Sequence, residues 1–215
     1  VRERPRPEYD PLGMRLGGFN LNAALDLGVT NSDNIFAEPT GADEDTVFTA
    51  ALRGRLSSNW SRHALTMEAG AATFNYDEFS SEDYDTSFAG IFGRLDVGSD
   101  SSISARARVA REAESRRDLD APPQGVPRAE YDQRELSLSA AHRFNRFRVS
   151  ATAAQFEQDF DGVQSYRDLD ETSLTARLEA ELTPRVGLLL QARTDERDYD
   201  NSPNLNSDGQ TYLVG

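Results

Sequence analysis

The chain has 215 residues and contains no cysteine, no lysine, and only two histidines and two methionines. Without cysteine it can form neither disulfide bonds nor zinc–thiolate sites, and it has no cysteine nucleophile. It also lacks any run of about 18 apolar residues, which excludes a transmembrane helix. All 23 basic residues are arginine, and 37 acidic residues outweigh them to give a net charge of −14. This acidic balance disfavours a protein that coats nucleic-acid phosphates.

Apolar residues are scarce as well, at 37% of the chain, with a mean hydropathy of −0.65. Composition alone would fit a polar or disordered chain. The order of the residues indicates otherwise, because apolar and polar residues alternate without a break over residues 19–29. Alternation of this kind is typical of a β-strand with two unlike faces. The same pattern recurs at 48–56, 65–72, 88–97, 103–109, 135–140, 147–153, 174–182 and 186–193, and a tenth strand begins near Thr211.

Strands of about ten residues suit a tilted crossing of a bilayer, whereas strands of soluble proteins usually have about five or six. The connections alternate between short turns (57–62, 98–101, 143–146, 183–185) and long polar loops (31–46, 77–85, 112–132, 157–171, 195–210). Outer-membrane barrels show the same alternation of short periplasmic turns and long extracellular loops. We therefore predict an all-β fold, an antiparallel up-and-down transmembrane β-barrel with about ten strands present.

A bacterial single-chain barrel needs an even number of strands and closure. The tenth strand has only Thr211 to Gly215, so we expect residues 17–215 to be the N-terminal part of a larger barrel. Residues 1–16 are rich in proline and arginine and are predicted to be a periplasmic arm or linker. Functionally this arm would meet a periplasmic export partner, and the alternative is a plain linker.

The five long loops hold 27 acidic residues and five arginines, a net charge of −22. The simplest interpretation is a solvated surface on which like charges repel. Alternatives are Ca²⁺ binding, although no EF-hand spacing is present, or divalent cations that bridge the loops to lipopolysaccharide. We predict no metal site and no cofactor.

Charged side chains also occur at the polar positions of the strands, which would face the lumen. Rings of charged side chains set selectivity in pores, and arginine suits anionic sugars or phosphates. The alternative is that these arginines and glutamates pair across neighbouring strands and only hold the barrel together. The candidate lumen residues are Arg53, Arg55, Glu68, Arg106, Arg108, Arg148, Arg177, Glu179, Glu181 and Arg193.

Aromatic residues cluster near the strand ends, as expected for two interfacial girdles. Phe74, Tyr76 and Phe156 fall on the lumen parity instead, which would need a bulge or a position above the membrane. The girdle candidates are Trp60, Tyr84, Phe144, Phe147 and Tyr199.

Catalysis has little support in the sequence. The two histidines, His63 and His142, both lie beside short turns, and no Gly-x-Ser-x-Gly nucleophile elbow is present. We predict no enzymatic activity and no catalytic residue.

Several short segments resemble the putative β-barrel porin 2 family, whose entry to the barrel is similar to residues 4–13 and 15–19. Further similar segments are 32–36, 60–63, 81–84, 142–146 and 197–200. The resemblance implies an outer-membrane β-barrel of a Gram-negative bacterium, in a family often associated with exopolysaccharide export. It implies no catalytic residues.

The leading hypothesis is an outer-membrane channel or porin, for polysaccharide export or for passive diffusion of polar solutes. The alternatives are a non-conducting outer-membrane scaffold or surface-interaction protein, and a soluble extracellular β-sheet binding module. Expected partners are outer-membrane lipid and lipopolysaccharide, a polysaccharide substrate and a periplasmic export protein, without nucleic acid.

Overall fold

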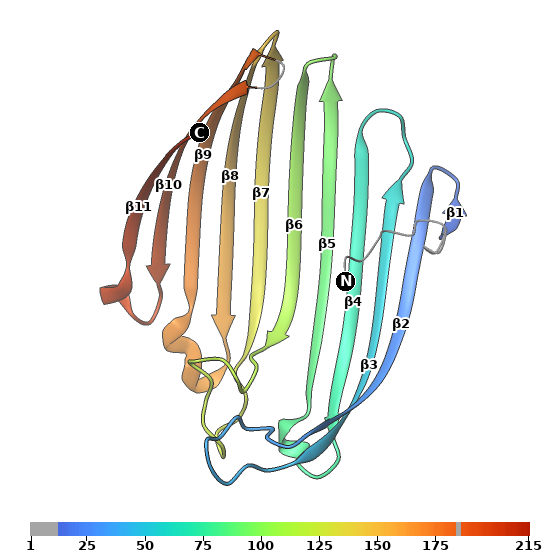
Figure 1. Cartoon of the computed structure of the whole chain (residues 1–215), viewed down its shortest axis with the longest axis vertical. Helices are drawn as coiled ribbons and strands as arrows, with labels where there is room; N and C mark the ends of the chain where they lie inside the picture. The colour runs from blue at the N-terminus through green and yellow to red at the C-terminus, as the bar shows by residue number, and fades with distance from the viewer. Residues whose placement is uncertain (1–12, 184–185) are drawn as a thin grey trace.

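The computed structural model describes residues 13–183 and 186–215, which form one antiparallel sheet (Figure 1). Long loops lie at one end of the sheet and short turns at the other. Three short 3-10 helices, η2 (Ser80–Glu82), η3 (Gly162–Arg167) and η4 (Pro203–Leu205), lie in the long loops. The strands are β1 (Met14–Leu16), β2 (Phe19–Ser32), β3 (Asp45–Ser58), β4 (Ala64–Tyr76), β5 (Tyr84–Val97), β6 (Ser101–Ala113), β7 (Glu130–Phe144), β8 (Phe147–Phe160), β9 (Leu169–Thr183), β10 (Val186–Tyr199) and β11 (Ser207–Val214).

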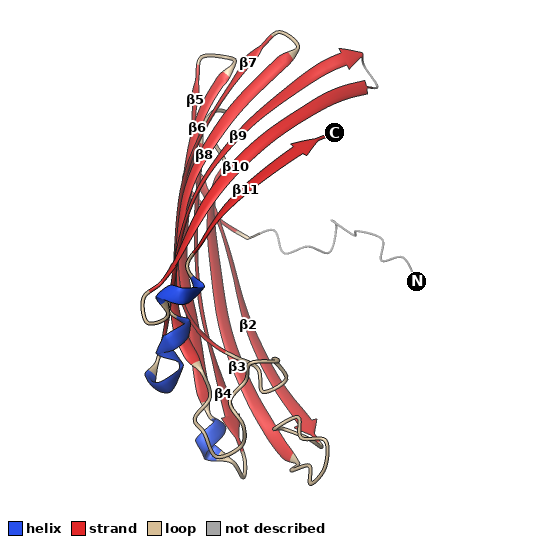
Figure 2. Ribbon diagram, turned by 90° about the vertical axis from the view of Figure 1, so that its left-hand side faces the viewer, coloured by secondary structure: helices blue, strands red, loops and turns tan. Residues whose placement is uncertain are grey.

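Each strand is hydrogen-bonded to its neighbours in sequence, in the order β1 to β11, so the topology is up-and-down. Within the described residues the first and last strands of this order are not paired with each other. Figure 2 shows from the side that the sheet is curved along its strands. Among the described residues, no helix is long and apolar enough to span a membrane.

The register joins the alternating positions into two continuous faces. One row of directly opposed residues runs from Arg55 through Glu68 and Gly90 to Arg108 and Glu135. This row belongs to what we call the polar face. The adjacent positions of each strand form the apolar face, where Leu25 and Leu27 are 66% and 75% exposed.

The apolar face is therefore uncovered by any part of the described chain. A soluble sheet buries its apolar face against a second layer, because burial of one leucine or valine side chain contributes about 1.5–3 kcal/mol. The few buried residues lie instead mostly near the long loops, as Ile35, Phe36, Glu82 and Arg116 do. An apolar face of this size is suited to contact with lipid.

The prediction of the all-β, up-and-down fold is confirmed, and each expected strand is present. The strands β2 to β10 have 13 to 15 residues, longer than the alternating apolar segments. Their charged ends pair across the sheet, so the long connections shrink to 33–44, 77–83, 114–129, 161–168 and 200–206. The expected loop bounds were too wide because charged residues at strand ends resemble loop residues.

The sequence pattern missed β1. Met14, Arg15 and Leu16 pair with Leu21, Asn20 and Phe19 of β2 through a turn at Gly17, whose φ is +60°. Three residues are too few for a periodic signal, so this strand could not be separated from the segment expected to be an arm. Residues 1–12 of that segment lie outside the described residues. Residues 184–185 of the predicted short turn 183–185 do so as well.

Candidate functional site

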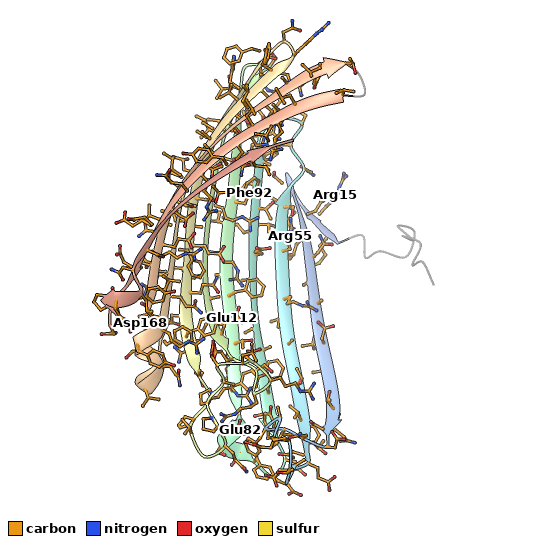
Figure 3. All side chains as sticks on the ribbon, turned by 60° about the vertical axis from the view of Figure 1, so that its left-hand side comes forward. Arg15, Arg55, Glu82, Phe92, Glu112 and Asp168 are labelled. Carbon is orange, nitrogen blue, oxygen red and sulfur yellow. The ribbon has the colours of Figure 1, made fainter. Side chains whose placement is uncertain are left out.

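All ten candidate lumen residues lie on the polar face. The registers of β3 to β10 connect them either directly or through positions two residues apart on one strand. In the side-chain view, Arg55 and Phe92 lie in the half of the sheet nearer the short turns, and Glu82 lies at the long-loop end (Figure 3). Whether the ten residues set the selectivity of a pore stays a prediction.

Most charged side chains of the polar face meet a partner of opposite charge. Arg55 lies 3.5 Å from Glu68, its directly opposed neighbour. The Arg193 guanidinium lies 2.5 Å from Glu171, and Arg177 lies 2.6 Å from Glu179 on the same strand. Such exposed pairs stabilise a sheet by at most about 1 kcal/mol each. Cross-strand pairing, the alternative considered from the sequence, is therefore present.

Arg106 differs from this pattern. Within the described residues it has no ion-pair partner, and its guanidinium lies over the ring of Phe92, 5.9 Å from the centroid. Its directly opposed neighbours are Phe92 and Ser137, neither of them charged. Arg108, two residues along, lies over Phe88 and also approaches Glu112 at 3.3 Å. Arg106 is thus an exposed, uncompensated cation on the polar face.

Gly70 leaves room for the Phe88 ring, which lies against it on the polar face. A Cβ at Gly70 would be 2.6 Å from Cε1 of Phe88 and 3.1 Å from the Leu52 carbonyl oxygen. We expect Gly70→Ala to lower the free energy of unfolding by about 1–3 kcal/mol, as overpacking does. The matched control is Gly90→Ala, where the nearest atom lies at 3.4 Å. Urea unfolding in lipid vesicles measures both, and equal stability of the two variants would contradict the packing argument.

The girdle candidates divide into two groups. Trp60, Phe144 and Phe147 lie at the short-turn end and are exposed, with Trp60 packed edge-on against Phe19. Tyr84 and Tyr199 lie on the polar face at the long-loop end, which does not fit a lipid-facing girdle. The Tyr84 ring stacks on Phe74 at 4.4 Å and has the Arg128 guanidinium 4.4 Å from its centroid.

The same packing explains the aromatic residues on the lumen parity. Phe74, Tyr76 and Phe156 lie on the polar face in regular register, without a bulge at these positions. Arg128 donates a hydrogen bond of 3.1 Å to the Tyr76 hydroxyl. Phe74 and Tyr76 therefore belong to the packing beneath the long loops.

The histidines do not form a catalytic group. His142 Nδ1 lies 2.6 Å from the Ser101 hydroxyl, its directly opposed neighbour on the apolar face. A serine hydrolase needs a third group to orient the histidine and donors for the oxyanion. Among the described residues, this pair has neither a third group that orients the histidine nor donors for an oxyanion. It is therefore a cross-strand hydrogen bond and not part of a catalytic triad. They also contain no group of three or more histidine, aspartate or glutamate side chains that could hold a metal ion.

Three long loops, 33–44, 77–83 and 114–129, fold together into what we call the loop cluster. At its centre the Glu82 carboxylate accepts hydrogen bonds of 2.6 and 2.8 Å from Arg116. Arg128 donates a third, of 3.1 Å, to Glu82. The side chains of Arg116, Glu82 and Arg128 are only 3%, 5% and 7% exposed. The expectation of solvated, mutually repelling loops fails at this centre, where three charges are buried and paired. Other charged residues of the same loops, such as Asp33 and Asp118, are exposed as expected.

Further contacts tie the loop cluster together and to the sheet. Arg116 also donates to the carbonyl oxygens of Pro122 and Val126, which fixes the long 114–129 loop around its guanidinium. Gln124 donates a 2.8 Å hydrogen bond to Asp43 in the first loop. Next to the cluster, Arg167 of η3 pairs with Glu114 at 2.5 Å, and this carboxylate raises the pKa of the Arg167 guanidinium.

Asp45 is the first residue of β3 and lies at the long-loop end of that strand. Its side chain anchors the 77–83 loop. Its carboxylate accepts hydrogen bonds from the backbone N–H groups of Thr46, Glu78 and Phe79. Burial raises the pKa of Asp45, but these N–H groups together outweigh that effect and hold the pKa below its ordinary value.

A carboxyl group with a lowered pKa in the folded state stabilises that state above its unfolded pKa, and the contribution is lost as the pH falls. We expect the 77–83 loop to lose protection below about pH 4, near the ordinary pKa of aspartate. Amide hydrogen exchange of this loop from pH 6 to pH 3 measures the effect. Asp45→Asn should weaken protection at pH 6 and flatten its pH dependence; an unchanged profile in this variant would contradict the assignment.

The sequence matches the family model described as "Putative beta-barrel porin 2" over residues 6–215. The chain belongs to this family. The resemblance stated from the short segments is confirmed, and the family points to a porin-like role in a bacterial outer membrane and to a non-enzymatic function. No curated protein sequence matches this family member.

Two solved structures are similar to this porin-family chain. The ferric yersiniabactin uptake receptor FyuA from Yersinia pestis has 13% identity and a TM-score of 0.45, over 93% of this chain and 38% of the receptor. The beta domain of the Bordetella autotransporter BrkA has 15% identity and a TM-score of 0.34, over 94% of this chain and 84% of that domain. The chain thus spans well under half the length of the receptor.

Proposed function

We propose that this protein is an outer-membrane channel for polar solutes. The observation that supports it best is the division of one long-stranded sheet into two unlike faces. The apolar face is uncovered, with most of the surface of Leu25 and Leu27 exposed, while the other face carries many paired charged side chains. A sheet of this kind in a porin family fits lipid on one side and a hydrated lumen on the other.

The finer proposal is export of polysaccharide. Its support is the polar face, where guanidinium groups, serine and threonine hydroxyls and half-buried phenylalanine rings such as Phe92 alternate. Sugars bind to such mixed surfaces through hydroxyl hydrogen bonds and ring contacts. A periplasmic export protein would then deliver the polymer at the short-turn end, and divalent cations would link the acidic loops to lipopolysaccharide.

Conductance in planar lipid bilayers tests the channel. Stepwise currents from the purified full-length protein, absent after heat denaturation, support it. Membrane insertion without current would favour the non-conducting scaffold. Solubility without detergent, with no shift in gel mobility on boiling, would favour the soluble binding module.

Arg106 supplies a selectivity prediction. As an exposed cation without an ion-pair partner in the described chain, it should attract anions into the lumen. Arg106→Gln is expected to shift the reversal potential in a salt gradient toward cations, with the conductance steps retained. Arg134→Gln removes an arginine of the same charge from the other face, where it pairs with Glu157, and should shift the potential less. Equal shifts in the two variants would refute a lumenal Arg106.

A further inference from the structure

The centre of the loop cluster holds more buried positive than negative charge. Arg116 and Arg128 both pair with Glu82, and neither has another carboxylate within ion-pair distance among the described residues. Their remaining hydrogen bonds go to neutral groups, the carbonyls of Pro122, Val126 and Glu114 and the Tyr76 hydroxyl. Two guanidinium groups thus share one carboxylate in a site where water is largely excluded. Buried charges are normally balanced, because an unpaired one is costly.

A second observation concerns Arg128 alone. Its side chain is only 7% exposed, and its buried Nε–H has no hydrogen-bond acceptor among the described residues. Buried donors in native proteins nearly always have an acceptor from protein, water or ligand. The donor without an acceptor therefore lies on one of the two arginines that make up the charge excess.

Both arginines line a cleft of about 270 Å³ between the loop cluster and the polar face. This volume lies close to the lower end of the roughly 300–1,000 Å³ of small-molecule sites. Arg117, exposed and without an ion-pair partner in the described chain, adds a third guanidinium to the wall. The rest of the wall is mixed, with the polar or aromatic side chains of Asn34, Ser115, Tyr76 and Tyr84 beside the apolar side chains of Ile35, Val47 and Ala113. Among the residues that the structure describes, none that lines the cleft is acidic.

We propose that this cleft binds an oxyanion, the carboxylate or phosphate group of a small solute or of a sugar. The Arg117 guanidinium has no partner among the described residues and Arg128 has an unused Nε–H, so both can donate to such a group. The donors of Arg116 are already taken by Glu82 and the loop carbonyls, so Arg116 contributes only positive charge. The surrounding loops are strongly acidic, so at the long-loop end the attraction for an anion is concentrated at this cleft. The site lies at the long-loop end and would capture an anion there before or after passage along the polar face. Anion binding is measured without a bilayer, whereas the channel is tested by conductance. The binding site can therefore be refuted while the channel is supported, and the channel can be refuted while the binding site is supported.

The test uses the full-length protein in detergent micelles at constant ionic strength. Calorimetric titration with sodium glucuronate and with sodium phosphate measures binding, and glucose is the neutral control. We expect one or both anions to bind and glucose not to bind. Binding of glucuronate assigns the site to a sugar carboxylate, and binding of phosphate alone assigns it to a phosphate group.

Arg117→Gln is the informative variant, because the Arg117 side chain makes no contact that holds the loops. It should weaken anion binding roughly tenfold, the loss expected for one charge-assisted hydrogen bond. Arg146→Gln, which removes an exposed arginine at the short-turn end, should leave the affinity unchanged. No binding of either anion, or equal affinity in Arg117→Gln and the unmodified protein, would overturn the proposal.

Discussion

Glu82→Ala is expected to unfold the loop cluster while the sheet remains intact. The substitution leaves Arg116 and Arg128 buried without their shared carboxylate, and removing one partner of a buried ion pair costs about 3–5 kcal/mol. No other carboxylate of the described residues lies within ion-pair distance to replace it. The loss should concentrate in residues 114–129, because Arg116 holds that loop through two of its carbonyl oxygens. Limited trypsin digestion, which cleaves after arginine, reports the opening directly.

Glu78→Ala is the matched control, since Glu78 lies in the same 77–83 loop and its side chain is exposed. It should leave the digestion pattern unchanged. If Glu82→Ala resisted trypsin as well as the Glu78 variant, the buried charges would not be what holds the loops together. Retained gel mobility before boiling confirms in both variants that the sheet still forms.

Ala140→Arg is expected to impair insertion into a bilayer, whereas Ala141→Arg is tolerated. The two alanines are consecutive in β7, so they point to opposite faces. Ala140 is opposed by Ile103 and Ala151 near the middle of the apolar face, and Ala141 by Ser102 and Ser150 on the polar face. Arginine facing lipid at the bilayer midplane costs about 2–4 kcal/mol.

This pair of variants has the same residue type, the same charge change and nearly the same position. The fraction of each variant that is folded in lipid vesicles, measured across a urea series, gives the difference in stability between them. If the two variants were equally stable, or Ala141→Arg were the weaker one, lipid would not contact the apolar face, and the assignment of the two faces would have to be reversed or abandoned.

The strands could be predicted because their signal is local. In β2 the alternation from Phe19 to Val29 is visible in consecutive residues, and its consequence, two unlike faces, follows from backbone geometry alone. The shared face of the ten candidate lumen residues follows from the same rule. The sequence also offers pairing of arginines and glutamates across neighbouring strands, but which residues pair, such as Arg55 with Glu68, depends on the register. Strand ends were less well defined, since Glu130 or Asp198 in a strand cannot be told from a loop residue by composition.

The loop cluster could not be predicted, because its contacts join residues far apart in irregular segments. Glu82 and Arg116 are 34 residues apart, and Glu82 and Arg128 are 46 apart. No period relates them, and the average charge of the loops suggested repulsion. The available signal was the rarity of arginine in these loops, where each one lies among many carboxylates. Asking which carboxylate each arginine could neutralise would have raised burial as a possibility, although not the choice of Glu82.

The neighbour-to-neighbour strand order also bears on how such a protein can change in size. Every hydrogen-bonded pair of strands is consecutive in sequence, so the hairpin is a self-contained module. Inserting or removing one whole hairpin keeps the loops at their own end, keeps each strand antiparallel to its neighbours and changes only the circumference. A single strand has no such freedom, because its loss would send the following loop to the wrong side of the membrane. Gain or loss of whole hairpins, two strands at a time, is thus the natural route by which this sheet could widen or narrow a pore.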